Sequence, residues 1–99
     1  MWKQIDGYRF LYRISDLGEV QRQMSEGVWK PVKPWLTKGG GGSAGMYLCV
    51  KLAINQEGHK RVPVVRLMEG RFIRPRKTGE IISHRNGMAG DCSRWNLYH

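Results

Sequence analysis

Short runs of β-branched and aromatic residues, separated by polar turns, run through most of this chain. Residues 8–14 and 19–24 flank a turn at 15–18, and residues 46–54 and 60–65 flank a polar stretch at 55–59. β-Branched and aromatic residues favour strands, whereas Gly, Asn, Asp and Ser favour the turns between them. The pattern therefore predicts two antiparallel hairpins.

The remaining segments predict one helix and further strand structure. Pro31, within the run 28–32, favours an edge strand because proline cannot donate to a ladder. Residues 65–72 present an apolar face and predict a short helix that ends near Pro75. Residues 80–84 predict a brief strand that leads into a glycine-rich turn and a polar loop. The expected fold class is α+β, a small and mostly antiparallel β sheet with one short helix.

The glycine-rich stretch at residues 39–45 divides the chain. Such a segment has little conformational preference, so it predicts a flexible loop, although Gly-Gly-Gly-Gly-Ser is also a common engineered linker. A chain of 99 residues is expected to form a single domain with a small core. We therefore predict one domain over residues 1–99, with strands in 1–38 and a second half in 46–99.

Composition excludes several classes of protein. No apolar run approaches the roughly 20 residues needed to cross a bilayer, and residues 1–6 lack the apolar segment of a secretory signal. We expect a soluble, cytoplasmic protein with no membrane partner. Cys49 and Cys92 are too few and too far apart for a disulfide framework or a zinc ribbon, so two buried or free thiols are expected.

Positive charge is concentrated in the C-terminal part of the chain. The formal net charge is +9, of which residues 58–99 contribute +6. Such charge favours a phosphate-bearing partner, because each neutralised phosphate releases counterions. A solvated basic face without a specific partner is the alternative, and an anionic membrane surface is a weaker one. The cations of the densest stretch are Lys60, Arg61, Arg66, Arg71, Arg74, Arg76 and Lys77.

Two of the three histidines differ in their surroundings. His59 lies in a polar turn and is expected at the surface. His84 ends a β-branched run and precedes Asn86-Gly87, a pattern in which a turn holds the imidazole at the mouth of a loop. Considered alone, His84 is also compatible with a purely structural histidine.

Two sets of motifs resemble those of HNH homing endonucleases of phage type. Residues 2–24 contain Trp2-Lys3-x-Ile5-x-Gly7-Tyr8 and Tyr12-x-Ile14-Ser15-Asp16-x-Gly18-x-Val20, which resemble the NUMOD4 motif at the start of such enzymes. Residues 60–98 contain Val64-x-Arg66-Leu67 and Ser83-His84-x-Asn86-Gly87 through Asn96-Leu97, which resemble the HNH motif with every spacing kept. The resemblance leaves the glycine-rich middle uncovered.

The resemblance implies roles for particular residues. His84 corresponds to the general base that activates water against a phosphodiester, and Asn96 to the residue that braces the loop around it. One divalent cation, Mg²⁺ or Mn²⁺, would stabilise the phosphate at the same site. Duplex DNA would be the partner, and the contacts to its phosphates would come from the cations named above together with Arg85 and Arg94.

Other side chains have more than one interpretation. Arg22 and Gln23 are candidates for contacts with base edges in a groove. Trp29, Trp35 and Trp95 could stack on unpaired bases, although burial in the core is the expectation for at least two of them.

The metal motif departs from the family pattern. Ser83 stands where the family has Asp or Asn as a metal ligand, and a neutral hydroxyl is a poor ligand for a hard cation. Val65 replaces the usual histidine of the helix motif, and Asp91-Cys92 replaces an Asn-Asn pair. The sequence ends at His99, before the helix that carries the second metal ligand in the family. We therefore expect an incomplete ββα-metal motif, with Asp91 or His99 as substitute ligands.

Three hypotheses follow. The first is an HNH endonuclease-like protein that binds duplex DNA and nicks it with one divalent cation and His84. The second is a catalytically inactive HNH derivative, kept as a nucleic-acid-binding module or as an inhibitor of a host nucleoprotein complex. The third is a basic module that binds an acidic protein. If the gene is phage-borne, the expected location is the cytoplasm of a bacterial host.

Overall fold

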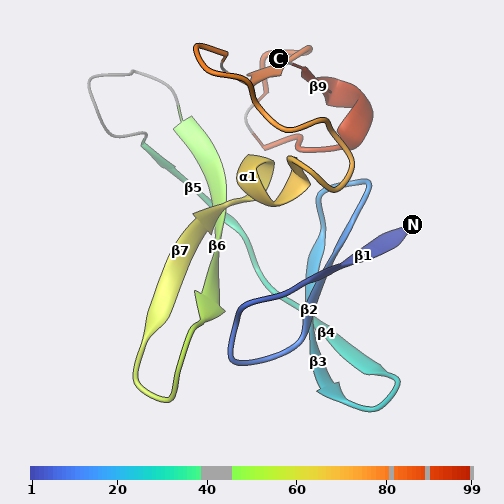
Figure 1. Cartoon of the computed structure of the whole chain (residues 1–99), viewed down its shortest axis with the longest axis vertical. Helices are drawn as coiled ribbons and strands as arrows, with labels where there is room; N and C mark the ends of the chain where they lie inside the picture. Colours follow the sequence, from blue (N-terminus) through green and yellow to red (C-terminus); the bar gives the residue numbers. More distant parts are fainter. Residues whose placement is uncertain (39–45, 81, 89, 99) are drawn as a thin grey trace.

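Three antiparallel sheets organise the computed structural model, which describes residues 1–38, 46–80, 82–88 and 90–98 (Figure 1). The first sheet contains, in spatial order, β1 (Trp2–Ile5), β2 (Tyr12–Ser15), β3 (Val20–Ser25) and β4 (Val28–Pro31). The second contains β5 (Trp35–Lys38), β6 (Met46–Ala53) and β7 (His59–Pro63). The third sheet pairs β8 (Ser83–His84) with β9 (Leu97–Tyr98), and the 3₁₀ helix η1 (Arg94–Asn96) directly precedes β9. With one short α helix, α1 (Val64–Met68), the predicted α+β class is confirmed.

Both predicted hairpins are present, as β2–β3 and β6–β7. Pro31 lies in β4, an edge strand, as predicted. The strand predicted to begin at residue 8 instead begins at Tyr12, because the segment before it links the two large sheets. The Arg9 N–H donates to the Ala53 carbonyl of β6 at 2.8 Å, and the Leu11 carbonyl accepts the Gln23 N–H of β3 at 2.8 Å.

The helix prediction was too long. α1 ends at Met68 rather than at residue 72, because Gly70 adopts φ +77° and turns the chain back. The N–H groups of the three residues after Gly70 all donate to the Met68 carbonyl, at 3.0–3.2 Å. The strand predicted over 80–84 is limited to Ser83–His84 among the described residues.

Strands β1, β5 and β9 were not predicted, since their sequences lack clear alternation. The predicted flexible loop at 39–45 lies outside the described residues. Among the described residues, no helix is long and apolar enough to span a membrane.

One hydrophobic cluster joins both large sheets, the helix and the C-terminal hairpin. Its members include Ile14 from the first sheet, Leu52 from the second, Met68 from α1 and Leu97 from β9. Each of these side chains is at most 4% exposed. The C-terminal hairpin is therefore attached to the core through buried apolar contacts.

The expectation that tryptophans fill the core was wrong. Trp35 and Trp95 are 40% and 59% exposed, and Trp29 is only half-buried. Aliphatic side chains from the sheets and α1 fill that space instead. Cys49 and Cys92 are both buried and form no disulfide, as predicted.

Candidate active site and nucleic-acid interface

His84 lies at the end of β8, in a loop closed by the third sheet. The Cα partner of His84 across the ladder is Leu97. The Arg85 N–H donates to the Asn96 carbonyl at 2.7 Å, and the Gly87 N–H donates to the His84 carbonyl at 3.0 Å. These bonds turn the chain immediately after the imidazole.

The side chain of Asn96 spans this loop. Its Oδ1 accepts the backbone N–H of Asn86 at 3.1 Å, and its Nδ2 donates to the Asp91 carbonyl at 2.8 Å and to Asn86 Oδ1 at 3.0 Å. Asn96 is only 6% exposed, so an amide without these partners would be costly. Its hydrogen bonds to backbone groups on both sides of the loop are those that a bracing amide requires.

Asp91 is held inside the same network. Its Oδ1 accepts the Ser93 hydroxyl at 2.7 Å and the Ser93 N–H at 3.3 Å, and its Oδ2 accepts Asn86 Nδ2 at 3.0 Å. The Ser93 hydroxyl, followed by the Ser93 N–H, lowers the pKa of Asp91. The carboxylate is therefore ionised at neutral pH and holds Asn86, the same side chain that Asn96 contacts.

The imidazole of His84 is half-buried and neutral. Burial lowers the pKa of His84, and the charge of nearby Asp91 opposes this effect only in part. His84 Nε2 lies 3.9 Å from Cys92 Sγ. Burial, together with the Asp91 charge, raises the pKa of Cys92 to about 11, so the thiol stays protonated. No hydrogen bond to His84 Nδ1 is found within the described part of the chain, and a neutral imidazole keeps one ring nitrogen that can accept a proton.

The turn between β2 and β3 holds this loop against the first sheet. Ser15 Oγ accepts the N–H groups of Leu17 and Glu19, each at 3.2 Å, and Gly18 adopts φ +82°. A Cβ atom on Gly18 would lie 2.9 Å from the Cys92 carbonyl oxygen. The turn is also bonded to the start of η1, because the Arg94 N–H donates to the Asp16 carbonyl at 2.8 Å.

These contacts give the N-terminal motif a structural role. From sequence, its serine and glycine were notable only as part of a family resemblance. The closeness of Gly18 to Cys92 could not be found from sequence, because the two residues are more than 70 positions apart.

The described residues do not assemble a site for a divalent cation. No group of three or more His, Cys, Asp or Glu side chains is placed to hold a metal ion in that part of the chain. Asp91, predicted as a substitute ligand, has both oxygens engaged with Ser93 and Asn86. Ser83 contributes only a neutral hydroxyl. His99, the other predicted ligand, lies outside the described residues.

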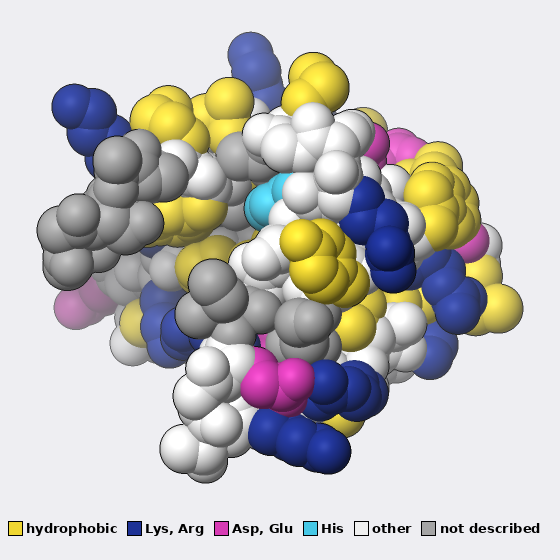
Figure 2. All heavy atoms as spheres, turned by 90° about the horizontal axis from the view of Figure 1, so that it is seen from above, with side chains coloured by type: hydrophobic (Ala, Val, Ile, Leu, Met, Phe, Trp, Pro, Cys, Tyr) yellow, Lys and Arg dark blue, Asp and Glu magenta, His cyan; other side chains and the backbone are white. Residues whose placement is uncertain are grey.

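Of the nine cations predicted to contact phosphate, Arg85 lies over the Tyr98 ring, 5.1 Å from its centroid, and Arg94 begins η1. The other seven separate into two groups. Lys60, Arg61, Arg66 and Arg71 line a hollow of about 200 Å³ beside β1 and β7. Figure 2 looks onto the end of the molecule that carries β8 and β9, and shows a histidine at the surface with Lys and Arg side chains to one side.

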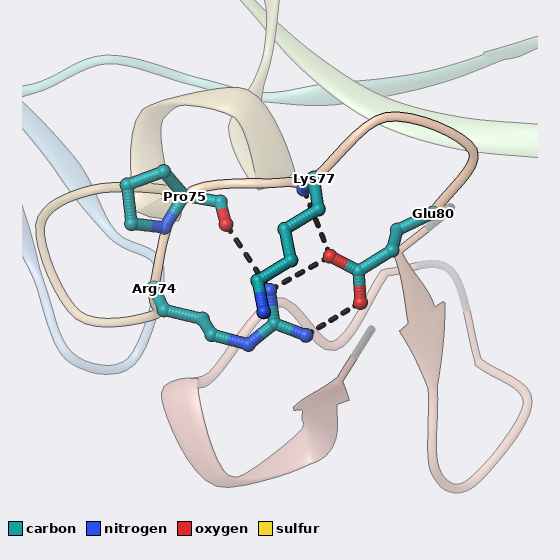
Figure 3. Close-up of polar contacts among 4 residues, drawn as sticks. All are labelled: Arg74, Pro75, Lys77 and Glu80. Carbon is teal, nitrogen blue, oxygen red and sulfur yellow. Dashed lines mark hydrogen bonds and ion pairs between the residues drawn. The ribbon is translucent and has the colours of Figure 1, made fainter.

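The second group is engaged in contacts within the chain. Arg74 forms two hydrogen bonds with the Glu80 carboxylate, at 2.7 and 2.5 Å, and this carboxylate also accepts the Lys77 N–H (Figure 3). Arg76 pairs with Glu69 at 2.7 Å. The segment after α1 therefore folds on itself, and its two arginines are partly neutralised. Both pairs are exposed enough to open at little cost.

The outer face of the first sheet carries a cluster that sequence reasoning missed. The Arg13 guanidinium lies between the rings of Trp2 and Trp29, 4.3 and 4.1 Å from their centroids. Its Nε and Nη2 donate to Gln21 Oε1 at 2.8 and 2.6 Å. Because side chains alternate along a strand, Gln23 of β3 lies on this face as well. The alternation alone does not show which residues face outward; that requires the strand register.

The register also separates the two residues predicted to contact base edges. Arg22 and Gln23 are adjacent in β3, so their side chains leave opposite faces of the sheet. Arg22 lies on the inner face, where its guanidinium is 3.5 Å from the centroid of Phe10. Only Gln23 shares the outer face with Arg13.

Comparison with known proteins gives one strong structural similarity. No protein-family model and no curated protein matches the chain. Among solved structures, the chain is similar to the HNH homing endonuclease I-HmuI, in a structure described as showing DNA binding and cleavage, with a TM-score of 0.71 and 27% sequence identity. The similarity covers 98% of this chain and 50% of that one, so the chain spans about half the length of its structural relative. In fold, the chain is therefore similar to part of an HNH homing endonuclease that binds and cleaves DNA.

Proposed function

We propose that this protein binds duplex DNA. The observation that carries the proposal is the similarity, over nearly the whole chain, to a DNA-binding HNH homing endonuclease. The net charge of +9 and the cationic hollow beside β7 support it, because DNA binding depends mainly on phosphate neutralisation.

Two surfaces take different roles in DNA binding. The hollow lined by Lys60, Arg61 and Arg66 contacts phosphates and positions the duplex. The outer face of the first sheet contacts base edges, because arginine and glutamine offer hydrogen bonds that fit guanine and adenine. Arg13 suits this role, since Trp2, Trp29 and Gln21 hold its guanidinium in place before any ligand arrives.

A salt titration tests DNA binding. The logarithm of the affinity for a short duplex should fall linearly with the logarithm of salt concentration, and each removed phosphate contact should reduce the slope by about one. We expect Arg61→Gln and Arg66→Gln to reduce the slope for every duplex sequence. Arg13→Ala should instead weaken binding only to preferred sequences. A slope near zero for the unaltered protein would contradict DNA binding and favour an acidic protein as the partner.

The His84 loop favours a second candidate activity, the nicking of a DNA strand by hydrolysis. A neutral imidazole held by a braced loop can accept the proton of a water molecule that attacks a phosphodiester. His84 is neutral, and Asn96 and Asp91 fix its loop. The described residues add no metal site to this arrangement, and the role assigned to the loop is proton transfer at His84.

Plasmid nicking tests this activity. We expect the unaltered protein to relax supercoiled plasmid in the presence of Mg²⁺ or Mn²⁺, and His84→Ala to lose the activity while keeping its DNA affinity. Gln56→Ala is the control, since Gln56 lies exposed in the turn between β6 and β7, outside the proposed binding surfaces, and this variant should cut normally. If His84→Ala and the unaltered protein cut equally, His84 is not the base. If neither cuts but both bind, the protein is an inactive derivative that acts through binding, as a module or as an inhibitor of a host nucleoprotein complex.

A further inference from the structure

A second cationic site lies between the two large sheets. The cleft has a volume of about 300 Å³ and is lined by residues of β2, β3 and β4 in the first sheet and of β6 and β7 in the second. The first sheet contributes Tyr12, Arg22 and Lys30, and the second contributes Lys51, Ala53 and His59. We call these six residues and the space between them the cationic cleft. No aspartate or glutamate lines it.

The strand register brings like charges together here. Arg22 and Lys30 are Cα partners in the β3–β4 pair, and Lys51 is the Cα partner of Arg61 in the β6–β7 pair. Like charges directly opposite each other destabilise a sheet. None of the three salt bridges found among the described residues involves these side chains. Among the described residues, no carboxylate therefore forms an ion pair with Arg22, Lys30 or Lys51.

The cleft also contains hydrogen-bond donors without acceptors. Arg22 Nε is buried and has no partner among the described residues. Its guanidinium is held 3.5 Å from the Phe10 centroid, so it is already ordered. Tyr12 is 3% exposed, and its hydroxyl oxygen accepts the Ala53 N–H at 3.0 Å, which leaves the phenolic hydrogen to donate. Buried donors are normally satisfied, so the Arg22 Nε–H and the Tyr12 hydroxyl hydrogen can donate to a ligand in the cleft.

We propose that the cationic cleft binds a phosphate group. A phosphate offers several acceptor oxygens and a negative charge, which match the unsatisfied donors and the uncompensated cations. The volume of the cleft is sufficient for a phosphate group with its water. The group belongs either to free phosphate or to a nucleic-acid backbone. Neither lysine nor His59 was among the predicted DNA contacts, so the site is additional to the surfaces proposed above.

Nuclear magnetic resonance with inorganic phosphate tests the cleft directly. We expect phosphate to shift the signals of Arg22 Nε–H and His59 saturably, whereas sodium chloride at matched ionic strength does not. The double variant Lys30→Gln/Lys51→Gln should bind phosphate about tenfold more weakly, because it loses charge-assisted hydrogen bonds. The matched control Lys33→Gln/Lys38→Gln removes two exposed charges outside the cleft and should bind phosphate normally.

The affinities of the two variants for duplex DNA distinguish between the two sources of the phosphate. If the cleft holds a backbone phosphate, the cleft variant binds DNA more weakly than the control variant, and inorganic phosphate competes with DNA. If the cleft holds free phosphate, both variants bind DNA equally and only the cleft variant loses phosphate binding. Absence of a saturable phosphate shift, together with equal DNA affinity of the two variants, would overturn the proposal. That result would leave DNA binding by the hollow beside β7 intact, because Arg61 and Arg66 are unaltered in both variants.

Discussion

Replacing Gly18 with alanine should destabilise the protein strongly, because two separate costs coincide there. A non-glycine residue at φ +82° costs roughly 1–2 kcal/mol. The new Cβ would also lie 2.9 Å from the Cys92 carbonyl oxygen and 3.0 Å from Cys92 Cβ, and overpacking of this kind costs roughly 1–3 kcal/mol more. The expected loss in the free energy of unfolding is about 2–5 kcal/mol.

Gly27 supplies the matched control. It adopts φ +74° in the β3–β4 turn, and a Cβ there would meet no atom within 4 Å. Gly27→Ala should therefore show only the backbone cost. Urea unfolding measures the difference between the two variants, which should be about 1–3 kcal/mol, and each kcal/mol should lower the melting temperature by about 4–8 °C. The His84 ring signals should shift in the Gly18 variant alone. Equal losses in the two variants, with unchanged His84 signals, would refute the coupling between this turn and the His84 loop.

Three further predictions concern the candidate site and its surroundings. Asn96→Ala should lower the free energy of unfolding by about 2–4 kcal/mol, because the backbone groups bonded to the Asn96 side chain lose their hydrogen-bond partner. Chemical denaturation measures this loss, and a change below about 1 kcal/mol would contradict the bracing role. Stability should fall as the pH drops below about 6.5, because His84 binds a proton more readily in the unfolded chain than in the folded one. His84→Gln should remove this part of the pH dependence in unfolding measured from pH 8 to pH 5, whereas a further loss below about pH 3.8, from protonation of Asp91, should persist. Glu80→Gln should change the free energy of unfolding by less than about 1 kcal/mol, since the ion pair with Arg74 is exposed. The same substitution should strengthen DNA binding, measured by fluorescence anisotropy, because Arg74 is no longer neutralised. Unchanged affinity would show that the Arg74 charge does not reach DNA.

Local sequence patterns were sufficient for the two central hairpins. Alternation and turn residues identified β2–β3 and β6–β7, and Pro31 identified an edge strand. Alternation and turn residues are local signals that lie within a few residues of each other, so they predict a hairpin without information on tertiary contacts. The helix was placed correctly but extended too far, because a positive φ at Gly70 depends on the packing that follows it.

Contacts between distant segments could not be predicted. At least two of Trp29, Trp35 and Trp95 were expected inside because of their apolar area, but none of the three is buried. Trp29 instead encloses Arg13 together with Trp2 on an outer face. The hydrogen bonds of Asn96 and the closeness of Cys92 to His84 likewise depend on how the C-terminal loop folds. The resemblance to HNH enzymes indicated which residues to consider, whereas the geometry of their contacts came from the structure.

The third sheet has a consequence for the timing of any chemistry at His84. Each of its strands is two residues long, so few ladder hydrogen bonds hold it, and isolated hairpins of this size are marginal in water. The network of Asn96, Asp91 and Asn86 keeps the loop closed together with buried Leu97 and the Gly18 turn. Amide hydrogens in this hairpin should therefore exchange through local opening, well before those of β6 and β7. The His84 site can therefore open locally while β6 and β7 stay paired, and how long it stays assembled depends on these side-chain hydrogen bonds and on its attachment through Leu97 and the Gly18 turn.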